Sequence, residues 1–142
     1  MNGFKFLFGC AMFAIAGQAA AQCTANERLN SASAINTHLS DKTVCGTGVG
    51  ANAGDQWQEY HQAGGTLTEY AKGPNDPVDP THAVGSWTTS GSGSNSVVTY
   101  SYNDGGSFSF NVHYDGTTTE FCNGNSQVAT ATLRSGQQGC GF

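Results

Sequence analysis

A tryptophan, a glutamate and a histidine alternate in the segment Trp57-Gln58-Glu59-Tyr60-His61. Side chains two residues apart on a strand point to the same face, so these three are predicted to share one. A glutamate can orient a histidine for proton transfer, and an indole can stack on a sugar or an aromatic ligand. The alternative, which we weigh more heavily, is an outer face with a partly buried tryptophan and two solvated polar side chains.

A second titratable group lies between residues 73 and 83, the segment that holds all three prolines. Asp76, Asp79 and His82 would form a hard-cation site or a rigid recognition loop. Calcium needs six to eight oxygen ligands, and the segment lacks the D-x-D-x-D-G spacing of known calcium loops. A structural connection, in which Asp caps turns and Pro fixes φ, is the better interpretation. We therefore predict no metal and no cofactor.

No arrangement of a nucleophile with a base is recognisable in the chain. Gly91-Ser92-Gly93 lies in a polar hairpin tip with no helix after it, unlike a hydrolase elbow. The glycine-rich residues 46–54 lack the Lys-Ser/Thr pair of a phosphate-binding loop. We therefore predict a protein that is not an enzyme, and an enzyme using Glu59 and His61 is the last-ranked alternative.

The first 21 residues have the pattern of an export signal. Lys5 is the only charged residue there, an apolar run follows from 6 to 16, and Ala19-Ala20-Ala21 forms an A-x-A cleavage site. The run is shorter than the ~20 residues of a membrane-spanning helix. We expect cleavage after Ala21, a single mature domain of residues 22–142, and a periplasmic or secreted location.

Charge and cysteine content fit this location. The chain has 5 Lys and Arg against 10 Asp and Glu, which argues against nucleic acid and anionic membranes as partners. Cys10 leaves with the signal, and an even number of cysteines in a small exported domain predicts disulfides rather than a metal site. Of the three pairings, we favour Cys45 with Cys122 and Cys23 with Cys140, which would join an early strand to a late one and the two termini.

Hydrophobic periodicity predicts one helix followed by strands. A helix over about 24–40 begins with Thr24 as N-cap and Glu27 reaching back to it, and it would cover one end of a β structure. From residue 42 the period changes to 2, and glycine-containing hairpin turns favour pairing of sequence neighbours. We predict a mainly β fold, a small antiparallel up-and-down barrel or meander of about eight strands, with an open β-sandwich as runner-up. The predicted strands are Lys42–Cys45, Gln56–His61, Thr66–Lys72, Val84–Ser90, Ser96–Asn103, Ser107–Tyr114, Thr117–Cys122 and Gln127–Arg134.

Aromatic residues concentrate on two neighbouring predicted strands. They are either the core that a domain of this size needs or the walls of an apolar pocket. The set comprises Tyr100, Tyr102, Phe108, Phe110 and Tyr114, with Trp87 as a further candidate wall.

The order of the short helix, Lys42–Cys45, Trp57–His61, Gly85-Ser86-Trp87 and Phe121-Cys122 resembles small secreted lipocalin-like proteins of Gram-negative bacteria, many of unknown function. The Gly85-Ser86-Trp87 step is similar to the G-x-W signature of calycin barrels. In lipocalins this signature sits on the first strand, whereas here it lies near the middle of the chain. The resemblance implies a barrel that binds something, and it carries over no catalytic residues.

These observations favour an exported binding protein that takes a small apolar or aromatic ligand or a protein partner. A ligand would contact the aromatic interior, and a protein would contact the loops at 46–54 and 73–83. The alternative is a structural subunit of an extracellular fibre or matrix, because low charge and many Ser, Thr and Gly residues suit edge-to-edge association. We expect a monomer or a weak oligomer.

Overall fold

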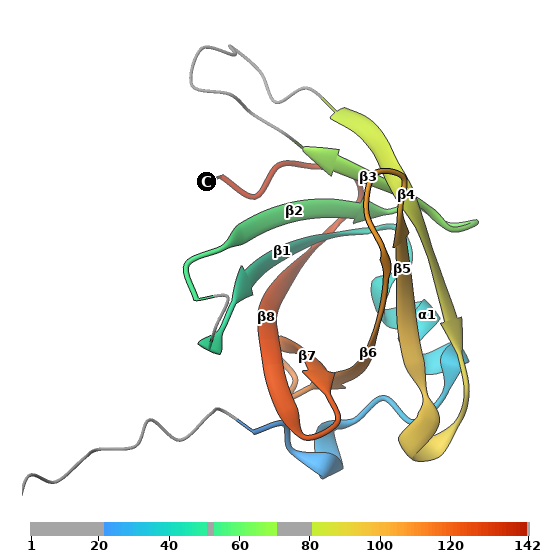
Figure 1. Ribbon diagram of the computed structural model, residues 1–142, viewed down its shortest axis with the longest axis vertical. Coiled ribbons are helices and arrows are strands. Elements are labelled where there is room, and N and C mark those ends of the chain that lie inside the picture. Colours follow the sequence, from blue (N-terminus) through green and yellow to red (C-terminus); the bar gives the residue numbers. More distant parts are fainter. Residues whose placement is uncertain (1–21, 51–52, 71–80, 142) are drawn as a thin grey trace, which may run out of the picture.

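The computed structural model describes residues 22–50, 53–70 and 81–141, which form a closed antiparallel barrel (Figure 1). Each strand pairs with its sequence neighbours, and β1 also pairs with β8 to close the sheet. The barrel prediction is confirmed, and the open sandwich is wrong. The strands are β1 (Lys42–Gly48), β2 (Gln56–His61), β3 (Thr66–Tyr70), β4 (Thr81–Ser90), β5 (Val97–Tyr102), β6 (Ser107–Tyr114), β7 (Thr119–Asn123) and β8 (Ser126–Ser135).

Strand boundaries follow pairing partners as well as local pattern. The predicted bounds of β2 and β6 match those observed. In contrast, β1 continues past Cys45 to Gly48, because Gly46, Thr47 and Gly48 pair with β8. The strand β4 begins at Thr81 rather than Val84, since its first residues pair with the end of β3. His82 therefore lies on a strand.

The N-terminal helix is shorter than predicted. Residues Ala25–Glu27 form a single 3₁₀ turn, and α1 spans Ala32–Leu39. The expected Thr24 cap is wrong, because Thr24 makes no side-chain capping bond. Ser31 caps α1 instead, with its hydroxyl accepting a 3.0 Å bond from the Ala34 N–H. Between the two elements the chain is extended and bridges to β6, which interrupts the helix.

The helix α1 closes one end of the barrel. It packs against β1, β4 and β5 and lies behind β5 in Figure 1. Its inward residues Ile35 and Leu39 are fully buried in the core. Because the strands alternate in direction, the β2–β3, β4–β5 and β6–β7 connections share this closed end. The β1–β2, β3–β4, β5–β6 and β7–β8 connections share the opposite, open end.

Two disulfides fasten the terminal segments to the barrel, but not in the predicted pairing. The bonds are Cys23–Cys122 and Cys45–Cys140. The N-terminal segment lies beside the β7–β8 hairpin, where the Cys23 N–H donates to the Asn125 carbonyl at 3.0 Å. The C-terminal segment returns along β1 and β2, so the two termini cover different parts of the wall and do not meet. No described helix is long and apolar enough to span a membrane.

Candidate functional site

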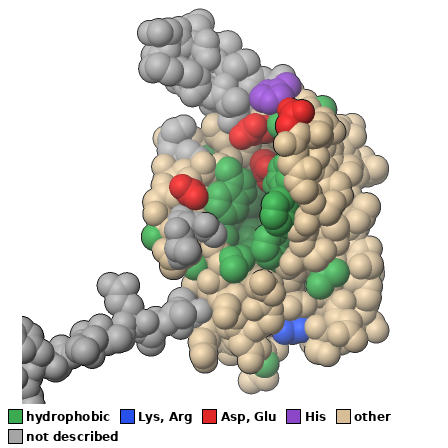
Figure 2. All heavy atoms as spheres, in the orientation of Figure 1, with side chains coloured by type: hydrophobic (Ala, Val, Ile, Leu, Met, Phe, Trp, Pro, Cys, Tyr) green, Lys and Arg blue, Asp and Glu red, His purple; other side chains and the backbone are tan. Residues whose placement is uncertain are grey.

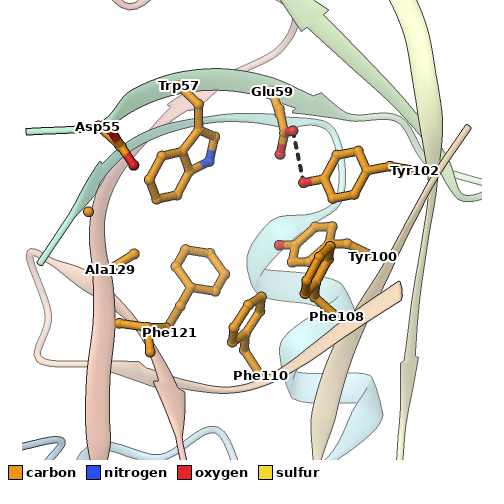
Figure 3. Close-up of a pocket in the computed structure, with 11 residues that line it drawn as sticks. Asp55, Trp57, Glu59, Tyr100, Tyr102, Phe108, Phe110, Phe121 and Ala129 are labelled. Atoms are coloured by element: carbon orange, nitrogen blue, oxygen red, sulfur yellow. Dashed lines mark hydrogen bonds between the residues drawn. The ribbon is translucent and has the colours of Figure 1, made fainter. Parts of the chain in front are cut away.

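The open end of the barrel contains a cavity of about 380 Å³. Figure 2 shows a hollow lined mainly by hydrophobic side chains, and Figure 3 shows the residues around it. This volume lies in the usual range for small-molecule sites. The lining residues are Gly48, Asp55, Trp57, Glu59, Tyr100, Tyr102, Phe108, Phe110, Phe121, Val128 and Ala129.

Aromatic rings from four strands, β2, β5, β6 and β7, form most of the wall. The rings of Tyr100, Phe110 and Phe121 form a triangle in which each pair of centroids is 6.3 Å apart. The rings of Tyr102 and Phe108 lie 6.2 Å apart. These spacings are typical of tilted and edge-to-face aromatic pairs. The structure thus brings four rings of the predicted set into one wall and adds Phe121.

Two aromatic candidates lie elsewhere. Trp87 is only 2% exposed and does not line the cavity; its indole N–H donates to the Gln62 carbonyl at 3.1 Å. Tyr114 is at the closed end of β6, where its ring packs 4.5 Å from that of His38. The alternation along their strands predicted that both residues face inward. Their positions along the strands place Trp87 deeper than the cavity and Tyr114 outside it.

Trp57 covers one side of the cavity because its neighbour is a glycine. Gly46 lies directly opposite it on β1, and the indole occupies the space that a Cβ at position 46 would fill. The two would approach to 2.2 Å, closer than atoms can pack. Gly46 therefore sets the orientation of the indole.

Glu59 places a carboxylate in this aromatic wall. The residue is 6% exposed, and the Tyr102 hydroxyl donates a 2.9 Å hydrogen bond to Oε1. Burial raises the pKa of Glu59 to about 7, an effect that the Tyr102 bond opposes and the nearby Glu69 carboxylate reinforces. The side chain can therefore exchange its proton near neutral pH.

His61 shares the inward face of β2 but does not reach the cavity. It is fully buried, with Nδ1 donating to the Glu59 carbonyl at 3.2 Å and Nε2 accepting from the Tyr100 hydroxyl at 2.9 Å. Burial lowers the pKa of His61 to about 4, so the ring is neutral. The favoured interpretation of an outer face with two solvated polar side chains is wrong, because Glu59 and His61 are buried on the inner face. The alternative in which the Glu59 carboxylate orients His61 is also wrong, because that carboxylate bonds Tyr102 and the Glu59 backbone carbonyl bonds the ring.

A polar row crosses three strands beside the cavity. Glu59 pairs with Glu69 on β3, and Glu69 pairs with His82 on β4, whose Nε2 lies 3.8 Å from the Glu69 carboxylate. This row and the β5–β6 turn border a second hollow of about 390 Å³ that shares Glu59 and Tyr102 with the first. Asp76 and Asp79, predicted to accompany His82, lie outside the described residues.

Acidic side chains gather around the open end of the barrel, whereas the closed end carries charges of both signs. Asp55, Glu59, Glu69 and Asp104 are at the open end, and acidic side chains border the hollow in Figure 2. The described basic side chains are near the closed end, where they bond backbone carbonyls of Ser94, Thr37 and Gly139. They are Arg28, Lys42 and Arg134; Lys72 is outside the described residues. No described Lys or Arg lines either hollow.

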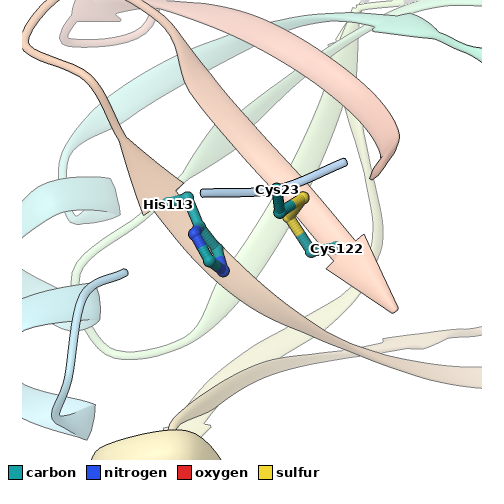
Figure 4. A group of neighbouring side chains, drawn as sticks. All are labelled: Cys23, His113 and Cys122. Carbon is teal, nitrogen blue, oxygen red and sulfur yellow. A yellow bond between two sulfur atoms is a disulfide. The ribbon is translucent and has the colours of Figure 1, made fainter. Parts of the chain in front are cut away.

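A second cluster of chemistry-bearing residues lies on the outside of β6 and β7 (Figure 4). A ring nitrogen of His113 and the sulfurs of Cys23 and Cys122 are within 4.8 Å of one another. The two sulfurs are bonded to each other, so they offer no thiolate to a metal. His113 Nδ1 donates to the Thr24 carbonyl at 2.7 Å, and its buried Nε2 has no hydrogen-bond partner. The arrangement is that of a covered disulfide.

Several wall residues were missed by sequence reasoning. Phe121 was noted only beside Cys122, although it follows the inward alternation of β7. Ala129 and Ala131 are buried on β8, and such small inward residues leave the space that the rings surround. The signal that could have predicted the cavity is a strand with small inward-facing residues combined with other strands whose inward-facing residues are aromatic.

Comparison with known proteins gives no family assignment. No protein-family model matches the chain, and no match is found among curated proteins or solved structures.

Proposed function

We propose that this protein is an exported, non-enzymatic binding protein that holds a small, largely apolar molecule in the open end of its barrel. The observation that carries the proposal is the cavity of about 380 Å³ walled by aromatic rings. Two disulfides fit an extracytoplasmic location.

The energetics of the wall support this proposal. Burial of apolar surface stabilises a fold by roughly 25 cal/mol per Å². A wall that keeps its rings facing an open hollow forgoes part of this stabilisation, and Phe108 remains 51% exposed. A ligand that displaced water from the rings would recover it. Since a barrel of this size can fill its interior with its own side chains, the unfilled open end favours a binding role.

The rival functions find less support. Closure of the sheet pairs every described strand on both sides, so the fibre hypothesis lacks the free edges on which it was based. The enzyme hypothesis needs His61 to reach a substrate, whereas the ring is buried and neutral. Neither observation favours a second function over ligand binding.

Filling the cavity tests the proposal. Ala129 is buried and lines the cavity, so Ala129→Phe adds a ring inside it. The matched control is Thr132→Phe on the same strand, at an exposed position. The probe is N-phenyl-1-naphthylamine, whose fluorescence rises in apolar surroundings. We expect the wild type and Thr132→Phe to bind it, and Ala129→Phe to bind about tenfold or more weakly. Equal binding by Ala129→Phe, or no binding by the wild type, would contradict the proposal.

A further inference from the structure

The cavity combines an apolar interior with one buried carboxylate. Phe110, Phe121 and Tyr100 form its aromatic depth, and Glu59 lies between Trp57 and Tyr102 in Figure 3. One oxygen of Glu59 accepts the bond from Tyr102, and the other points into the space between the rings. A ligand that fills this space meets aromatic faces on most sides and a carboxylate oxygen on one.

The charge around the cavity selects among ligand classes. An anionic ligand, such as a fatty acid, would face Asp55, Glu59 and Glu69 with no described Lys or Arg in either lining. Like charges in such a partly desolvated site repel each other strongly. A neutral ligand would exclude water from Glu59 and leave its ionised form with the hydrogen bond from the Tyr102 hydroxyl, which is unfavourable for a buried charge.

A cationic group satisfies the same carboxylate. A protonated amine would form a charge-assisted hydrogen bond with the free oxygen of Glu59. The same amine would lie near the indole of Trp57 and the phenol of Tyr102, whose faces attract cations. The rest of the ligand would fill the aromatic depth.

We propose that the cavity selects molecules in which an apolar aromatic body carries a protonated amine, with Glu59 as the counter-ion. This inference rests on the binding function proposed above, and it adds the chemical class of the ligand. It also assigns unequal roles to the carboxylates of the open end, because Glu59 lines the cavity whereas Glu69 lines only the neighbouring hollow.

Three probes of one shape and different charge test the inference. They are 1-naphthylmethylamine, 1-naphthalenemethanol and 1-naphthoic acid, titrated into the oxidised protein by calorimetry at pH 8, where the amine is protonated. We expect the amine to bind about tenfold or more tightly than the alcohol, which is the usual effect of a hydrogen bond to a charged group. The acid should bind more weakly than the alcohol.

Two matched variants locate the effect. Glu59→Gln keeps the size and the acceptor for Tyr102 but removes the charge, so the amine should fall to the affinity of the alcohol while the alcohol changes little. Glu69→Gln makes the same chemical change on the adjacent strand, and the preference for the amine should change less than about twofold.

A measurement on the wild type does not depend on how the variants fold. Glu59 is faced by Glu69 on β3 and by Tyr100 and Tyr102 on β5, and His82 on β4 faces Glu69. Protonation of Glu59 at pH 5 should reduce the preference for the amine about tenfold relative to pH 8.

The outcomes separate this inference from the proposed function. Equal affinities for amine and alcohol in the wild type would overturn the inference and leave apolar binding intact. A preference that persists in Glu59→Gln would overturn the assignment to Glu59. Tighter binding of the acid would overturn the charge argument. If none of the three binds while N-phenyl-1-naphthylamine does, the inference fails alone, and if no probe binds, the proposed function fails with it.

Discussion

Replacing Glu59 with glutamine should stabilise the unliganded protein, and increasingly so as the pH rises above about 4.5. Burial raises the pKa of Glu59 from 4.5 to about 7 in the folded state. Between these values the folded state binds more protons than the unfolded state, so the free energy of unfolding falls as pH rises. The destabilisation caused by the buried Glu59 charge is therefore fully present above pH 7 and absent below pH 4.5.

The size of this penalty follows from the pKa difference. At about 1.4 kcal/mol per pH unit, the buried charge destabilises the fold by about 3 kcal/mol at pH 8 and by about 1 kcal/mol at pH 5. Glu59 is 6% exposed, so solvent screening reduces these values little. A glutamine carbonyl can still accept the Tyr102 hydrogen bond, and the substitution therefore removes the charge with little other change.

Urea denaturation of the oxidised protein at pH 5 and pH 8 measures the effect. The advantage of Glu59→Gln over the wild type should grow by about 2 kcal/mol between the two pH values, with unchanged m-values. Asp104→Asn, at an exposed turn position, is the control and should change stability by less than about 0.5 kcal/mol at either pH. An advantage of the same size at both pH values would refute the account of Glu59 as a buried, raised-pKa carboxylate.

Two further substitutions test how the wall is held. Gly46→Ala places a methyl group where the Trp57 indole lies, so the indole should move and its fluorescence emission should shift to longer wavelength. This variant should also bind N-phenyl-1-naphthylamine at least about tenfold more weakly. The control is Gly106→Ala, whose Cβ would approach other atoms no closer than 3.8 Å, and it should leave emission and binding unchanged. Tyr100→Phe removes the hydroxyl that bonds His61 Nε2, and leaving this buried nitrogen without a partner should destabilise the protein by about 1–3 kcal/mol in the same urea assay. An unshifted emission in Gly46→Ala, or an unchanged midpoint in Tyr100→Phe, would contradict the respective contact.

Local periodicity predicted the strands but not which face is inside. On β2, Gln58 on the outer face is as buried as Glu59 on the inner one, because the C-terminal segment covers it and the Cys140 N–H donates to its amide oxygen at 2.7 Å. On β6 the outward His113 is likewise buried, under the N-terminal segment. When both faces of a strand are covered, alternation of polar and apolar residues no longer identifies the interior.

The same long-range packing decided the disulfides and the helix. The pairing of Cys23 with Cys122 depends on the N-terminal segment lying beside β7 and β8, a contact between residues 99 apart in sequence. The capping pattern at Thr24 is a local signal, and pairing of the following residues with β6 outweighs it. Neither contact can be predicted from the pattern of residues in a short stretch of sequence.

Depth along the strand separates the roles of Glu59 and His61. Two residues of a strand advance by about 6.6 Å, so side chains on one face can lie in different layers of a barrel. Glu59 reaches the cavity, while His61 lies one layer deeper with Trp87, at a ring separation of 5.1 Å. Alternation predicted a shared face, and only the position of α1 at the closed end determines which layer is open.

Stability and ligand selection make opposite demands at position 59. A glutamine there would fill the same space and keep the Tyr102 bond without a buried charge, so stability alone favours it. Residues that lower the stability of a fold without a structural reason concentrate at functional sites. If Glu59 serves a cationic ligand, Glu59→Gln must be the more stable protein at pH 8 and the poorer amine binder. If Glu59 has only a structural role, the substitution should change stability without changing the preference for the amine. The two assays together therefore distinguish a tolerated charge from a functional one.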